Sequence, residues 1–195
     1  NDWTSHLLEP QTRQEYNLSM SKGTDNSRVY FSLGYLDDKG FNRNTGFKRL
    51  SSRLAYDSQL TNWLRISASS QLSRTETQNR SNEETNLSNP FQWTRMIAPI
   101  YPVHLHNADG SYRTDALGNL QYDPGSYTND NGDVVLTRNQ FGDRHVAWEN
   151  ELDKDRIVRN TLEATFYTEF KFLKDFTFTL KGQTSMRNNV NDTFD

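Results

Sequence analysis

The sequence predicts an all-β protein: an antiparallel up-and-down segment of a transmembrane β-barrel, with about six strands and one long extracellular loop. Three observations support this prediction. Apolar and polar residues alternate over several stretches of the chain, the period of a strand whose two faces meet different surroundings. Full charges stand in the middle of the polar rows, and short and long connections follow each other in turn.

Composition narrows the class of protein further. Of 195 residues, 33% are hydrophobic and 12% aromatic, which is lean for a packed core but too aromatic for a disordered chain. The net charge of −3 gives no reason to expect nucleic acid as a partner. Without cysteine, the chain has no disulfides and no zinc–thiolate site. No run reaches the ~18 apolar residues of a membrane helix, whereas a barrel strand needs only ~9–11 residues.

The expected elements follow the alternation. Residues 1–14 are polar, Pro10 interrupts any short helix there, and no signal peptide is recognisable, so we expect a connector. Residues 15–76 are expected to form barrel strands with short turns and one medium loop, and residues 156–188 a barrel hairpin. The polar, asparagine-rich end, 189–195, is expected to start the next loop.

The two faces of these strands are predicted residue by residue. One face is apolar and is expected to meet lipid; its members are Val29, Phe31, Leu33, Leu54, Ile66, Phe166 and Phe178. The other is expected to face water in a lumen; its charged members are Arg53, Asp57, Arg65, Glu163, Glu169 and Lys181. A sandwich core would not tolerate those charges on its inner side.

Connection lengths predict which end of the sheet faces outward. In an up-and-down sheet alternate connections lie at the same end, so all short turns gather at one end and the loops at 37–46 and 77–155 at the other. Outer-membrane barrels show this asymmetry, with short periplasmic turns and long extracellular loops. Interfacial aromatic girdles would then contain Trp63, Phe172 and Phe176 near the turns and Tyr35, Phe41 and Phe47 near the loops. Since bacterial barrels have at least 8 strands, we expect a fragment of a larger barrel.

Several short runs resemble the early barrel of SusC/RagA-type TonB-dependent outer-membrane transporters. The similar segments are Tyr-Asn-Leu-Ser-Met-Ser at 16–21, Tyr-Phe-Ser-Leu-Gly-Tyr-Leu at 30–36, Phe-Lys-Arg at 47–49 with Arg53-Leu54 and Asp57, and Asn-Trp-Leu at 62–64. Asp-Trp-Thr at 2–4 is similar to the family's segment just before these strands, and 107–112 to a turn in its loops.

The resemblance implies a fold, a location and partners. The family has a 22-stranded barrel with an N-terminal plug, in the outer membrane of Gram-negative bacteria. It imports oligosaccharides or peptides, driven by TonB and the proton-motive force, under a SusD-like lipoprotein lid. This chain lacks the plug, the TonB box and most strands, so transport and TonB contact are implied for a parent protein. The family is not enzymatic, and no catalytic motif carries over.

The long loop supplies the candidate substrate-binding residues. Its aromatic side chains could pack against sugar faces or peptide side chains while their polar edges keep a hydrogen bond. These residues are Trp93, Tyr101, Tyr112, Tyr122 and Tyr127. Packing within the loop is the alternative role for the apolar stretch at 91–103, which should be buried somewhere.

Other constellations favour weaker hypotheses. His104 and His106 lack a third metal ligand nearby, and the acidic cluster at 129–133, with Asp109 and Asp123, departs from the spacing of a calcium loop. Glu149 and Glu151 could be drawn as the acid–base pair of a β-rich hydrolase, but we expect no enzyme, no metal and no cofactor. A soluble extracellular β-sheet module that binds glycans is the alternative to the transporter.

Overall fold

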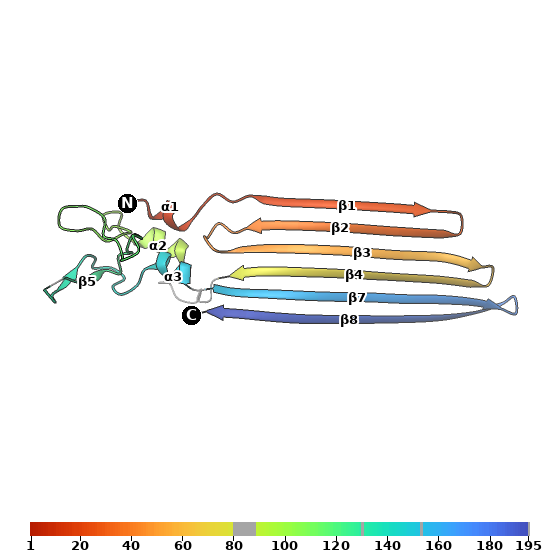
Figure 1. Ribbon diagram of the computed structural model, residues 1–195. Coiled ribbons are helices and arrows are strands. Elements are labelled where there is room, and N and C mark those ends of the chain that lie inside the picture. Colours follow the sequence, from red (N-terminus) through yellow and green to blue (C-terminus); the bar gives the residue numbers. More distant parts are fainter. Residues whose placement is uncertain (80–88, 130, 153, 195) are drawn as a thin grey trace.

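The computed structural model describes residues 1–79, 89–129, 131–152 and 154–194. A long antiparallel sheet extends from a smaller body of loops and short helices at one end (Figure 1). The elements are α1 (Trp3–Leu7), β1 (Arg13–Gly23), β2 (Ser27–Lys39), β3 (Gly46–Thr61), β4 (Leu64–Asn79), α2 (Pro90–Met96), β5 (Ser126–Thr128), β6 (Val134–Leu136), α3 (Val146–Leu152), β7 (Lys154–Phe172) and β8 (Phe176–Phe194).

The six long strands form one sheet in the order β1-β2-β3-β4-β7-β8. Each neighbouring pair is antiparallel, so the predicted all-β, up-and-down arrangement is confirmed. The described residues form an open wall and not a closed barrel. Its outer strands, β1 and β8, have no further strand beside them among the described parts of the chain.

All short connections lie at one end of the wall, as the connection lengths predict (Figure 1). We call this the turn end; it holds the β1–β2, β3–β4 and β7–β8 turns. The opposite, loop end holds the β2–β3 connection and the chain between β4 and β7. Leu173 and Lys174 adopt φ angles of 50° and 64° in the last turn, a left-handed conformation that closes a tight hairpin.

Two expected boundaries are wrong. The segment from residue 189 belongs to β8, which pairs along its whole length with β7. Hydrogen bonds to β7 satisfy the backbone groups of this asparagine-rich segment. The start of the chain is more than a connector. Asp2 caps the short helix α1 by accepting a hydrogen bond from the Ser5 amide, and α1 buries Trp3 and Leu7.

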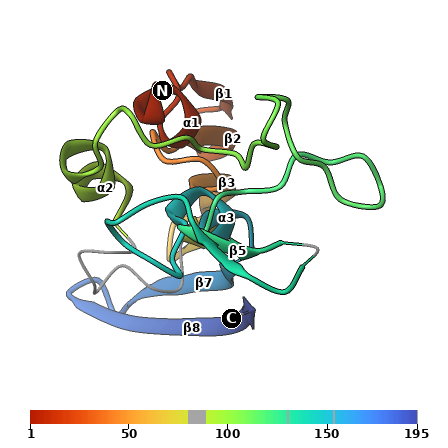
Figure 2. The same ribbon diagram turned by 90° about the vertical axis from the view of Figure 1, so that its left-hand side faces the viewer.

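The described part of the stretch between β4 and β7 is folded. It contains α2, α3 and the β5–β6 hairpin, and further bridges pair His104 with Tyr122, His106 with Tyr112 and Thr114 with Leu120. Residues 80–88, 130 and 153 of the predicted loop lie outside the described residues. With α1, the described part of this stretch forms a body that we call the cap; Figure 2 shows it from the loop end.

The wall leaves its large side chains open to the surroundings. The accessible surface is 13546 Å², against about 9500 Å² for a globular protein of this mass. Apolar residues across the wall, such as Leu18, Leu54 and Phe166, are about half exposed, whereas the buried cluster lies in the cap. In the described part of the chain, no helix has the length and apolar character that crossing a membrane requires.

Candidate functional site: a two-faced wall and its cap

The strand register sorts the predicted residues onto two faces. Phe31 pairs with Leu54, Val29 with Tyr56 and Leu33 with Ser52, and partners in a pair share a face. Continuing the register through β4, β7 and β8 places all seven residues expected to meet lipid on one side, which we call the apolar face.

The opposite side, the polar face, carries all six predicted charges. Arg53 pairs through Gln71 with Glu163, and Asp57 through Ser67 and Tyr167 with Lys181. The Arg65 guanidinium donates to both carboxylate oxygens of Asp57 at 3.1–3.2 Å. The charges are thus partly paired with one another and stay in contact with solvent, as on a wetted surface.

Aromatic rings rim the apolar face at the turn end. Trp63 stacks on Phe170 with centroids 6.3 Å apart, Phe170 lies 6.3 Å from Phe178, and Phe172 stacks on Phe176 at 5.7 Å. At the other border, Tyr16 pairs with Tyr35 on the same face. The expected place of Phe47 is wrong, because β3 puts Phe47 in register with Asp38 on the polar face.

The uncharged part of the apolar face ends abruptly toward the loop end. From Phe172 up to Leu162 on β7 the row contains no charge, a span of about eleven residues. Beyond Leu162 the same face carries Arg74, Lys48, Glu76, Arg156 and Asp192. Arg156 donates to Glu76 at 2.8 Å and lies 3.8 Å from Asp192.

The core of the cap is built around two tryptophans. Trp93 and Trp3 lie 5.7 Å apart, and Phe141 lies 4.6 Å from Trp93. The Trp3 indole donates to the Tyr101 carbonyl at 3.0 Å, which ties the start of the chain to the loop. Trp93 is 0% exposed, so the prediction that it contacts a substrate does not fit its place in the folded cap.

The four predicted tyrosines differ in their surroundings. Tyr101 and Tyr122 pack against the buried cluster of the cap. Tyr112 is 57% exposed and its ring packs at a tilt against His106, and Tyr127 lies under the Arg113 guanidinium at 4.6 Å. Tyr112 is therefore the one exposed residue of the five predicted for the site, and the structure does not bring the five together.

Two buried basic residues hold the cap together, and the sequence alone did not point to either. The Arg138 guanidinium lies over Trp93 and donates to the carbonyls of Asp123, Gln140 and Phe141. Burial and the nearby Arg138 charge lower the pKa of His145 to about 3, so this imidazole is neutral. Its Nε2 lies 2.9 Å from the Val103 carbonyl, and this contact links the start of α3 to the segment around Val103.

A polar cavity of about 340 Å³ lies where the cap meets the loop end of the wall. Segments distant in sequence supply its lining, which includes His6, Glu9, Arg43, Asn44, Tyr122, Asn150 and Glu151. The Tyr122 hydroxyl donates to Glu151 at 2.7 Å, and burial next to that carboxylate raises the pKa of Tyr122 to about 12. Arg43 holds the Ser5 carbonyl at 3.3 Å. Such a cavity offers hydrogen bonds and both signs of charge to a ligand that enters between the loops.

The acidic residues considered as a hydrolase pair or as calcium ligands take part in local structure. Glu149 and Glu151 lie on α3, not on a strand; Glu149 accepts from Arg144 at 2.7 Å and from the His145 amide. Asp109 and Asp123 each accept backbone amides two residues ahead, at Ser111 and Gly125, as in Asx turns. Among the described residues, no three histidine, aspartate or glutamate side chains gather at metal-binding distance.

The fold thus defines a class: an antiparallel up-and-down wall with an apolar face, a polar face, turns at one end and a folded cap at the other. No protein-family model and no curated protein matches the sequence. Solved structures do. The chain is similar to the RagAB peptide importer in its open–open state, with TM-score 0.61 and 18% identity, and in its closed–closed state, with TM-score 0.57 and 18% identity. A further structure of the RagAB peptide transporter gives TM-score 0.58 and 16% identity.

The similarity spans nearly all of this chain but a small share of those proteins. In each case it covers 96% of this chain and 19% of the other. At this identity, the comparison shows that the wall and cap share a fold with part of a transporter.

Proposed function

We propose that this chain forms part of the wall and the outer cap of a TonB-dependent outer-membrane transporter of the SusC/RagA type. The observation that carries the proposal is the sorting of the wall into two faces. An uncharged row of about eleven residues equals the length of strand that crosses a bilayer, and its aromatic rim at the turn end resembles an interfacial girdle.

The polar face would then line a water-filled lumen. Its arginines, aspartates and glutamates cost little in water but several kcal/mol in hydrocarbon. The open edges at β1 and β8 require further strands in lipid, since each unpaired backbone group there costs several kcal/mol. The proposal therefore places the chain in a larger barrel, as its 19% share of the importer chains suggests.

The cap would face the outside of the cell and meet the incoming nutrient. Its polar cavity and the exposed ring of Tyr112 suit an oligosaccharide or a peptide. A SusD-like surface lipoprotein would close over this end, as the RagAB name pairs two components, and TonB would act on the parent protein. We propose transport and not catalysis, with Glu149 and Glu151 holding the cap together.

Orientation in the membrane tests this proposal. In the whole protein on intact cells, a cysteine placed at the exposed tip residue Leu117 (Leu117→Cys) should react with a membrane-impermeant maleimide. A cysteine in the β7–β8 turn (Lys174→Cys) should react only after the outer membrane is permeabilised. This chain has no cysteine of its own, and the whole protein without either substitution is the control for labelling elsewhere. Equal labelling of both, or recovery of the protein in a soluble fraction, would contradict the proposal and favour a soluble module.

A further inference from the structure

The apolar face contains two hollows that follow each other along the strands, and we call them together the trough. Its part nearer the loop end is a hollow of about 470 Å³ whose apolar walls are Leu33, Leu50, Leu72, Leu162 and Met186. A second hollow of about 490 Å³ continues the trough toward the turn end, where small residues form its floor: Ala68, Ser70, Ala164, Gly182 and Thr184. Register places both hollows on the same face, over β3, β4, β7 and β8.

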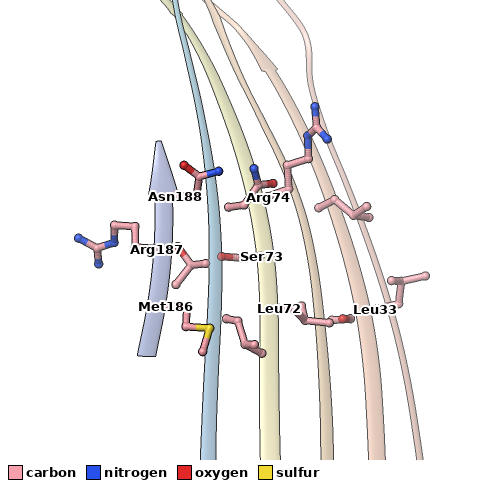
Figure 3. A pocket seen from close by; sticks show the side chains of 12 residues that line it. Leu33, Leu72, Ser73, Arg74, Met186, Arg187 and Asn188 are labelled. Atoms are coloured by element: carbon pink, nitrogen blue, oxygen red, sulfur yellow. The ribbon is translucent and has the colours of Figure 1, made fainter. Parts of the chain in front are cut away.

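Arg74 provides a positive charge at the loop end of this trough. Arg74 lies one row above Leu72, in register with Leu50 on one side and Asn160 on the other, and Asn160 pairs with Asn188. Figure 3 shows Arg74 and Asn188 at the loop-end rim of the hollow, with Leu33, Leu72 and Met186 below them. Arg187 also borders the hollow, but its register with Thr161 places its side chain on the polar face.

The Arg74 guanidinium is only partly neutralised, because it lies near the Glu76 carboxylate but is not paired with it. Among the residues the structure describes, it forms no ion pair and no side-chain hydrogen bond. The nearest acid along its strand, Glu76, is engaged by Arg156, which also approaches Asp192. Lys48, in register with Glu76, adds a second cation at this level. The trough is therefore bordered by a positive charge and two side-chain amides at the end nearer the loops, and its lining toward the turn end has no charge.

We propose that this trough is a binding site for a phosphate-bearing anionic lipid in the outer-facing leaflet of the membrane around the wall. The headgroup phosphate would accept hydrogen bonds from Arg74 and from the Asn160 and Asn188 amides, because guanidinium matches phosphate geometry. One acyl chain would lie over the small residues, from Leu72 to Gly182. The four rows from Arg74 to Ala68 give the trough a length of about 20 Å along the strand. The site rests on the proposed function, since it needs the apolar face to meet lipid.

Native mass spectrometry of the whole protein, purified in detergent and delipidated, tests the site. Phosphatidylglycerol and phosphatidylcholine with identical chains serve as probes. We expect the wild-type protein to prefer phosphatidylglycerol and Arg74→Gln to weaken that binding about fivefold, the usual contribution of one basic residue at a lipid headgroup. Arg53→Gln removes a charge from the polar face and should leave the preference intact.

A second variant tests the acyl-chain part of the trough. A side-chain carbon added at Gly182 meets nothing within 4 Å, so Gly182→Leu should fold normally and fill the trough. We expect Gly182→Leu to weaken the binding of both lipids, while phosphatidylglycerol still binds more tightly than phosphatidylcholine. Unchanged binding in Arg74→Gln, an equal loss in Arg53→Gln, or occupation of the trough by a second copy of the chain would overturn the site. Absence of the protein from the membrane would instead overturn the proposed function.

Discussion

Leu54→Arg is expected to destabilise the wall by about 2–4 kcal/mol, the cost of a cation on the lipid side of a barrel near the bilayer midplane. Leu54 lies on the apolar face between Phe31 and Ser70, about half exposed. In water such a surface change would cost little, so a large effect requires hydrocarbon around the side chain.

The adjacent residue supplies the matched control. Ala55 lies on the polar face between Tyr30 and Ser69, with Arg53 and Asp57 two residues away on either side. Ala55→Arg adds the same charge to the same strand and should cost well under 1 kcal/mol. Reversible denaturant unfolding of the whole protein in lipid bilayers measures both values. Similar costs for the two variants would contradict the assignment of the faces.

Replacing Trp93 by alanine is expected to destabilise the cap by about 3–5 kcal/mol, as for a fully buried large aromatic residue. The indole contacts Trp3 and Phe141, and the Arg138 guanidinium lies over it. Its loss leaves a cavity between α1, α2 and α3 and exposes a buried cation whose ring partner is gone.

Hydrogen exchange of backbone amides measures this effect segment by segment. In Trp93→Ala, amides of α2 and α3 should exchange much faster while those of the wall keep their protection, because strand pairing does not depend on the cap core. Tyr112→Ala, which removes a largely exposed ring, should leave the cap protected. Unchanged amide protection of the cap in Trp93→Ala would show that the core of the cap lies elsewhere.

The wall could be predicted from the sequence because its period is strong. Along β3, Leu50, Ser52, Leu54 and Tyr56 alternate with Arg49, Ser51, Arg53 and Ala55, and each strand repeats that pattern toward the same two environments. Strand ends were harder to predict. Beyond the apolar band the alternation between polar and apolar residues ends, although backbone pairing continues, as in the asparagine-rich end of β8.

The cap could not be predicted in the same way. Its core takes single apolar residues from separate places, including Trp3, Leu7, Trp93 and Val146, and short helices give no sustained period. Arg138 and His145 carry no local signal either, because their partners are backbone carbonyls brought together only by folding. The same holds for the polar cavity, whose lining comes from the chain start, the β2–β3 loop and α3.

Fluorescence quenching at single cysteines tests the central claim most directly. Leu72→Cys and Gln71→Cys place a thiol-linked fluorophore on neighbouring residues of β4, the first on the apolar face and the second on the polar face. In bilayers, spin-labelled lipid should quench the label at 72 and leave the label at 71, whereas water-soluble iodide should do the reverse. If both labels are quenched by iodide alone, or if the label at 72 is shielded from both quenchers in a dry protein interior, the apolar face does not meet lipid.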